Sequence, residues 1–95
     1  MTISIKFLSI LKNHAGTDSF ELSNTGGKTL REVLLIVDRQ FFSGTNLVFD
    51  TGGVHVNPAL LVMVNGQDYH LLENQLDTLL EGTEEILLLS SLHGG

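Results

Sequence analysis

Two glycines, Gly94-Gly95, end the sequence and follow an apolar run, Ile86 to Leu89, after a short link. A glycine pair has no side chains, so it is thin and adopts backbone angles closed to other residues. These properties suit a tail that enters a narrow channel and offers its terminal carboxylate to another enzyme. The alternative is a frayed end, because chain termini are often mobile, and the sequence has further glycine pairs at Gly26-Gly27 and Gly52-Gly53.

The remaining residues offer little chemistry of their own. The chain has no cysteine, which excludes a disulfide, a thiol nucleophile and an iron–sulfur cluster. No nucleophile stands beside a base at a recognisable spacing, and no phosphate-binding loop or cofactor motif is present. The four histidines, His14, His55, His70 and His93, show no metal-ligand spacing. We therefore predict a protein that is not an enzyme, with no catalytic residue, no metal site and no bound cofactor.

Charge is divided unevenly along the chain, whose formal net charge is −6. All five basic residues lie in the first 39 positions, and no Lys or Arg occurs from Gln40 onward. Because affinity for nucleic acids depends on Lys and Arg, we predict no direct nucleic-acid binding. An acidic half favours a partner with a basic surface, although acids also serve solubility alone. The acids expected in such a surface, or in a merely solvated turn, are Asp77, Glu81, Glu84 and Glu85.

The length of 95 residues predicts one domain. We expect this domain to span residues 1–91 and to be followed by a flexible tail, 92–95. No apolar stretch approaches the roughly 20 residues of a membrane helix, so we expect no membrane contact. The first residues lack a basic segment followed by an apolar one, which argues against a signal peptide and favours a cytoplasmic location.

The first half of the chain predicts a hairpin and a helix. Polar and apolar residues alternate from Thr2 to Leu8 and from Ser19 to Ser23, which indicates two half-buried strands joined by a long loop. Thr29 and Glu32 then have the spacing of a capping box. Apolar residues at helical spacing follow, so we predict a helix from about Leu30 to Gln40.

The second half predicts two central strands. Leu60 to Val64 is apolar at every position and is followed by Asn65-Gly66, a strong signal for a tight hairpin with a return strand near residues 68–70. Ile86 to Leu89 is a second run that is apolar on both faces. Residues 71–81 fit a short helical turn and loop. Segment 42–58 is irregular, with a short strand or a loop packed on the core as alternatives.

The predicted fold class is therefore α+β, a mixed sheet of four to five strands with one main helix in the order β-β-α-β-β. One helix covers only one face of a sheet, yet both central strands are apolar on both faces. The uncovered face should then carry an apolar patch, and exposed patches of this kind usually bind a partner. The alternative is that segment 42–58 covers that face. The residues expected in the patch are Leu61, Met63, Leu87 and Leu89.

This pattern resembles the ubiquitin-like sulfur carriers, which include the small subunit of molybdopterin synthase, the thiamine-pathway sulfur carrier and the ubiquitin-related modifier. The resemblance implies the β-grasp fold. It is most specific for the ubiquitin-related modifier, and the matching residues are Val56-Asn57-Pro58, Val64-Asn65, Tyr69, Leu71-Leu72 and Ser91-Leu92-His93-Gly94-Gly95. The molybdopterin synthase subunit usually has a proline before its terminal glycines, whereas this chain has none after Pro58. That subunit remains the alternative.

The resemblance also implies a mechanism. A ubiquitin-activating-like enzyme, an adenylyltransferase and sulfurtransferase, would use ATP to adenylate the Gly95 carboxylate, and a sulfur donor would convert it to a thiocarboxylate. A tRNA thiolation enzyme would then use the sulfur to make 2-thiouridine at the wobble position. In a second use, the activated carboxyl would form an isopeptide with a lysine of a target protein. Gly94, His93 and Leu92 would dock the tail.

Overall fold

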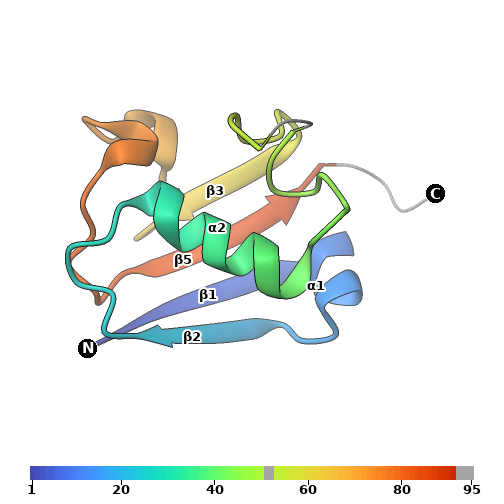
Figure 1. Cartoon of the computed structure of the whole chain (residues 1–95), viewed down its shortest axis with the longest axis horizontal. Helices are drawn as coiled ribbons and strands as arrows, with labels where there is room; N and C mark the ends of the chain where they lie inside the picture. Colours follow the sequence, from blue (N-terminus) through green and yellow to red (C-terminus); the bar gives the residue numbers. More distant parts are fainter. Residues whose placement is uncertain (51–52, 92–95) are drawn as a thin grey trace.

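The computed structural model describes residues 1–50 and 53–91 of the chain. Five strands form one sheet, with a main helix lying across one face of it (Figure 1). The strands are β1 (Thr2–Leu8), β2 (Ser19–Ser23), β3 (Leu60–Val64), β4 (Gln67–Asp68) and β5 (Glu85–Ser90). The helices are α1 (Ile10–Ala15) and α2 (Leu30–Phe41), and two 3₁₀ turns follow β4, η1 (Tyr69–Leu71) and η2 (Gln75–Asp77).

The strands lie in the order β2-β1-β5-β3-β4, so the last strand is inserted in the middle of the sheet. β5 runs parallel to β1 and antiparallel to β3, and the other neighbouring pairs are antiparallel. This mixed sheet with one main helix confirms the predicted α+β class, the β-grasp fold and the β-β-α-β-β order. It also confirms that the two strands apolar on both faces occupy central positions.

The main helix begins where the capping box predicts. The Thr29 hydroxyl accepts a hydrogen bond from the Glu32 amide at 3.1 Å, and the Glu32 carboxylate accepts one from the Thr29 amide at 3.1 Å. These bonds satisfy two of the amides that a helix start leaves without partners. The hydrogen bonds from Thr29 hold the pKa of the Glu32 carboxyl below its ordinary value. The helix ends at Phe41, one residue beyond the prediction.

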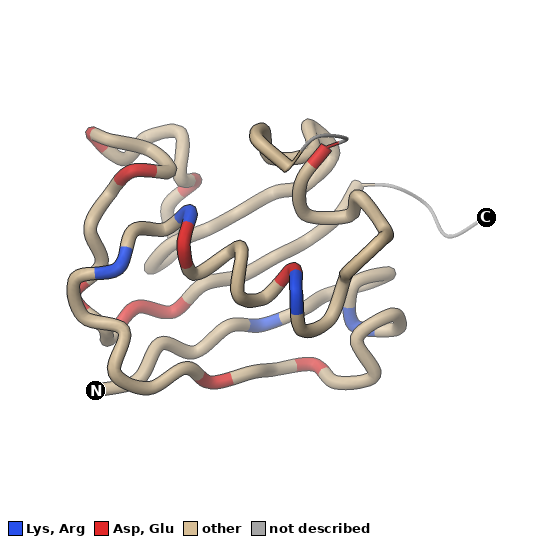
Figure 2. Tube along the Cα trace, in the orientation of Figure 1, with Lys and Arg blue, Asp and Glu red and all other residues tan. Residues whose placement is uncertain are grey.

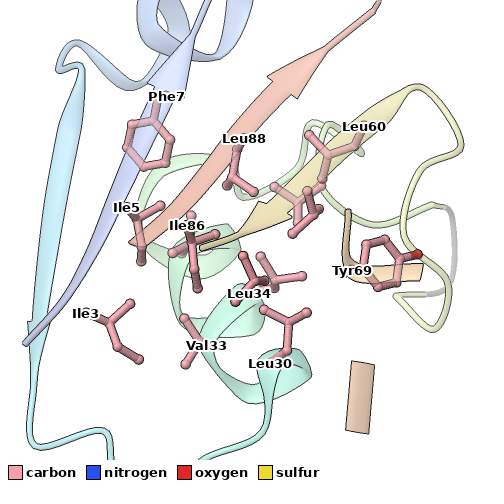
Figure 3. Close-up of a cluster of buried hydrophobic side chains, with 14 of the residues drawn as sticks. Ile3, Ile5, Phe7, Leu30, Val33, Leu34, Leu60, Tyr69, Ile86 and Leu88 are labelled. Atoms are coloured by element: carbon pink, nitrogen blue, oxygen red, sulfur yellow. The ribbon is translucent and has the colours of Figure 1, made fainter. Parts of the chain in front are cut away.

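The core lies between α2 and the sheet (Figure 3). Ile3, Ile5 and Phe7 project from β1 and are fully buried, as the alternating pattern predicts. Apolar residues recur on α2 at helical spacing, and this stripe faces the strands. The other fully buried side chains of the strands and α2 are Val62, Ile86, Leu88, Leu30, Val33, Leu34 and Val37.

The loop between β1 and β2 differs from the prediction, because it contains a short helix, α1. Only Leu11 is fully buried in this helix. A helix of six residues completes fewer than two turns, so it is too short to show a periodic apolar pattern. Tertiary packing of Leu11, rather than local propensity, therefore supports it.

The described part of segment 42–58 packs on the helix side of the sheet (Figure 1). Val48 and Phe49 are buried in the core, and Phe49 forms an isolated bridge with Val56. The Asn57 amide donates to the Val48 carbonyl at 2.9 Å. Residues 42–50 and 53–58 thus form a loop packed on the core, and the alternative in which they cover the open face of the sheet is wrong.

The return strand after the Asn65-Gly66 turn is shorter than predicted. Both turn residues have positive φ, 50° and 80°, as a tight hairpin of this kind requires. β4 ends at Asp68, whose carboxylate accepts a hydrogen bond from the His70 amide at 2.9 Å. This contact turns the chain into η1 and ends the strand. The hydrogen bonds from His70 hold the pKa of the Asp68 carboxyl below its ordinary value.

Candidate partner surface and tail attachment

β5 fixes the backbone up to the point where the predicted tail begins. The strand is paired on both sides, with Leu87 between Lys6 and Met63 and with Leu89 between Leu8 and Leu61. One residue beyond the strand, the Ser91 amide donates to the Ala59 carbonyl at 2.7 Å. The backbone is therefore held as far as Ser91. The predicted tail residues Leu92, His93, Gly94 and Gly95 lie outside the described residues.

The sheet face opposite α2 carries the four predicted apolar residues. Leu61 pairs with Leu89 and Met63 pairs with Leu87 across the β3–β5 ladder, so the four side chains form one cluster. Leu61 is 37% exposed and the other three are half-buried. We call Leu61, Met63, Leu87 and Leu89 the open-face cluster. Leu8, the neighbour of Leu89 on β1, extends it and is 38% exposed.

A hollow of about 290 Å³ adjoins this cluster. Met63 and Leu87 form its apolar part, Lys6 on β1 contributes a cation, and Glu85 at the start of β5 contributes an anion. Lys6 and Glu85 are exposed, and neither forms an ion pair with another described residue. The hollow therefore suits an apolar side chain of a partner, with one charge of each sign available for polar contacts around it.

The acidic turn before β5 is built around a buried carboxylate. Glu84 is 7% exposed, and its carboxylate accepts hydrogen bonds from the amides of Glu81 at 2.7 Å, Gly82 at 2.9 Å and Thr83 at 3.1 Å. Burial alone would raise the pKa of this carboxyl, but the backbone hydrogen bonds outweigh it and hold the pKa below its ordinary value. Glu84 was expected on the solvent-exposed surface, but the structure buries its side chain inside the turn. Only Glu81 and Glu85 remain as exposed acids of the predicted set on this turn.

The same turn is held against the loop that precedes α2. The Gly27 amide donates to the Leu80 carbonyl at 3.0 Å. Gly82 has a φ of +106°, which strains any other residue, and a Cβ added there would lie 3.1 Å from the Gly26 nitrogen, so a side chain would have to push the two loops apart. On the other side, the Asn65 side-chain oxygen accepts a hydrogen bond from the Glu85 backbone amide at 2.9 Å. The Asn65 backbone amide donates to the Glu85 carbonyl at 2.8 Å. The start of β5 is thus held by two separate segments, the loop before α2 and the turn after β3.

A second hollow of about 290 Å³, which no sequence pattern predicts, lies on the helix side. Arg31 dominates its chemistry: the guanidinium Nη1 donates to the Val54 carbonyl at 2.8 Å, and Nε lies 3.6 Å from an Asp77 carboxylate oxygen. These contacts tie α2 to segment 42–58 and to η2. The signal missed in the sequence is long-range, because Arg31 lies 23 residues from Val54.

Within residues 1–50 and 53–91, no group of three or more His, Asp or Glu residues is placed to hold a metal ion. The described helices are all too short or too polar to cross a membrane.

A comparison with protein families shows which family the chain belongs to. The model of the Urm1 family, the ubiquitin-related modifiers, matches residues 2–95. The chain belongs to this family. The ubiquitin-related modifier 1 of Schizosaccharomyces pombe is 35% identical to it over 92 residues, which cover 93% of this chain and 90% of that protein.

Solved structures support the fold of this ubiquitin-related modifier family member. The small archaeal modifier protein 1 of Methanosarcina acetivorans superposes with a TM-score of 0.80 at 25% identity, covering 99% of this chain and 96% of that one. Urm1 of Trypanosoma brucei superposes with a TM-score of 0.79 at 24% identity, covering 99% and 95%. Members of the family are named as ubiquitin-related modifiers, and this chain shares the fold of the solved members.

Proposed function

We propose that this chain is a sulfur carrier whose last residue, Gly95, is the reactive group. An activating enzyme uses ATP to adenylate the Gly95 carboxylate, and a sulfur donor then converts the adenylate to a thiocarboxylate. A tRNA thiolation enzyme takes this sulfur to form 2-thiouridine at the wobble position. In a second use, the activated carboxyl forms an isopeptide with a lysine of a target protein.

One observation carries this proposal. The match to the ubiquitin-related modifier family extends through Gly95, and β5 holds the backbone in place up to Ser91, directly before the matched tail residues. A fixed strand followed by a short link and two glycines, which have no side chains, suits a carrier that must present one carbonyl to several enzymes. The folded body supplies the grip, and the tail supplies the electrophile.

The chemistry of each step explains why the chain needs partners. A carboxylate is a poor electrophile because its negative charge repels a nucleophile and oxide is a poor leaving group. Transfer of AMP from ATP removes that charge and creates a good leaving group, with pyrophosphate as the second product. A sulfur nucleophile then attacks the carbonyl carbon and AMP departs with the bonding pair. The chain itself supplies no acid or base to these steps.

The open-face cluster is the surface that we propose for the activating enzyme. Leu61 and its three neighbours are exposed or half-buried on a rigid sheet, and the adjoining hollow accepts an apolar side chain. Glu81 and Glu85 stand on the neighbouring turn and favour a basic patch on the enzyme. No Lys or Arg follows Arg39, so the turn itself carries no cation, and the cations of the chain lie on β1, α1, α2 and the loop before α2 (Figure 2).

The proposal is tested by intact-mass measurement after incubation with ATP, an activating enzyme and a sulfur donor. The expected result is the mass increase that accompanies replacement of one oxygen by sulfur, located on Gly95 by fragmentation. A chain without Gly94-Gly95 is the matched control and should show no such increase. Its circular dichroism spectrum should match that of the full chain, which would show that the fold is intact. Absence of the increase in the full chain would contradict the carrier function.

The fate of the sulfur is tested in cells that lack their own carrier of this type. The full chain should restore 2-thiouridine in tRNA, and the chain without Gly94-Gly95 should not. If the thiocarboxylate forms but tRNA is not thiolated, the tRNA part of the proposal fails. Co-purification with a large catalytic subunit would then favour the alternative of a molybdopterin synthase small subunit.

A further inference from the structure

The outer edge of β2 presents backbone groups that no other described strand pairs with. β2 is the last strand of the sheet on its side (Figure 1). The Phe7 amide donates to the Asp18 carbonyl at 3.0 Å, so residues of even number on this strand bond to β1. The Ser4 amide bonds instead to the Glu84 carbonyl, away from β2, which agrees with this alternation. The amides and carbonyls of Ser19, Glu21 and Ser23 therefore point outward.

One of these three positions is already occupied. The Thr17 hydroxyl donates to the Ser19 carbonyl at 3.1 Å and accepts from the Ser19 amide at 3.4 Å. Thr17 thus uses both outward groups of Ser19 and shortens the edge that another strand can pair with. Open strand edges are a known hazard for uncontrolled association, and such local blocking limits it. The outward groups of Glu21 and Ser23 remain available.

The negative charge on this edge argues against a second copy of the chain as the partner and favours a different protein. Asp18 and Glu21 are exposed acids, and the strand carries no Lys or Arg (Figure 2). Glu21 forms no ion pair with a described residue. If two copies paired through the groups of Glu21 around a twofold axis, the two Glu21 carboxylates would face each other directly or diagonally. Like charges in those positions are destabilising.

We propose that the outer edge of β2 binds an extended segment of another protein, antiparallel to β2, with a Lys or Arg opposite Glu21. Strand addition of this kind gains its affinity from main-chain hydrogen bonds and its specificity from alternate side chains. The residue opposite Glu21 lies on the same face of the sheet and forms the ion pair. Its two neighbours project to the helix side, where Phe20 and Leu22 are half-buried apolar residues. An apolar–basic–apolar sequence is therefore the pattern that fits.

This inference goes beyond the proposed function, which uses the tail and the open-face cluster. β2 is separated from β5 by β1, so its outer edge is a different surface. Loss of binding at the β2 edge should therefore leave thiocarboxylate formation intact, and the two proposals fail independently.

The test is an NMR titration of the full chain with two capped peptides, Thr-Val-Lys-Val-Thr and Thr-Val-Glu-Val-Thr. The Lys peptide should shift the amide signals of Glu21 and Ser23 most and should bind about threefold to tenfold more tightly than the Glu peptide. The Glu21→Lys variant should reverse this preference. Glu73→Lys makes the same change in net charge at an exposed loop position and should leave it unchanged.

A gain-of-function variant sharpens the test. Thr17→Val keeps the size of the side chain but removes the hydroxyl, which frees both outward groups of Ser19. The Lys peptide should then bind about threefold more tightly, because further main-chain hydrogen bonds become available. Equal binding of the two peptides, shifts confined to the open-face cluster, no shift at millimolar peptide, or dimerisation of the chain alone through β2 would each overturn the proposal.

Discussion

The two faces of the sheet share the same strands and nearly the same residue types, yet they have different environments. On the covered face, Val62 and Leu88 are fully buried against α2. On the open face, their neighbours Leu61 and Leu87 remain exposed or half-buried. The difference shows that an apolar side chain in a central strand has no fixed role of its own. The position of α2 assigns one set to stability and leaves the other set for binding.

The comparison is tested most strongly by two neighbouring leucines. Leu88→Ala should destabilise the fold by about 2–5 kcal/mol, because it removes buried methyl groups and leaves a cavity. Leu87→Ala makes the same change on the open face and should cost clearly less, because solvent already reaches that side chain. Chemical denaturation followed by circular dichroism measures both. Equal losses would mean that the two faces do not differ in their contribution to stability.

The buried carboxylate of Glu84 is expected to have the next largest effect. Glu84→Gln keeps the shape but removes the charge that accepts three backbone amides, so we expect a loss of about 1–3 kcal/mol at neutral pH. Glu85→Gln, at an exposed position next to it, is the matched control and should change stability by less than about 0.5 kcal/mol. If both variants behave alike, the amide bonds to Glu84 do not support the turn.

The pH dependence of stability follows from the lowered pKa of Glu84. Because the carboxyl binds a proton less readily in the folded state, its contribution is fully present above its unfolded pKa. It is lost as the pH falls from that value through the folded pKa. The stability difference between the parent chain and Glu84→Gln should therefore shrink on acidification. Denaturation curves across this range measure it, and a difference that grows at low pH would reverse the assigned sign.

The stability of α2, the helix that covers one of the two faces, depends on the hydrogen bonds of its first turn. Thr29→Ala removes the hydroxyl that accepts the Glu32 amide, and we expect a loss of about 1 kcal/mol. Thr83→Ala, the same substitution at an exposed position outside the helix, should be nearly neutral. Thermal unfolding compares the two. An unchanged melting temperature in Thr29→Ala would show that packing alone holds the start of α2.

The smallest effect is expected from the lysines. Lys6 lies beside the open-face cluster, and Lys12 and Lys28 lie on α1 and before α2. We predict that conjugates linked through these lysines are rare, so a variant with all three changed to arginine should keep its high-mass conjugates in cell extract. Loss of most conjugates in this variant would contradict the prediction. Its stability serves as the control and should match that of the parent chain.

The sequence alone was enough to predict the elements whose signals are local. The alternation in β1, the capping box at Thr29 and the Asn65-Gly66 turn each depend on residues within a few positions of one another, and each is found where it was predicted. The sequence also predicted that one helix would leave one face of the sheet uncovered, but only the structure decided that the described part of segment 42–58 does not cover it.

Tertiary structure decided what local patterns do not encode. The burial of Glu84 depends on the close approach of two loops, and the anchoring of Arg31 on Val54 joins residues far apart in the chain. The register of β5 between β1 and β3 determined which alternate set of leucines faces outward. These features arise from contacts between distant segments. Their energy depends on the folded arrangement as a whole, so residue types and spacing predict the elements but not their mutual placement.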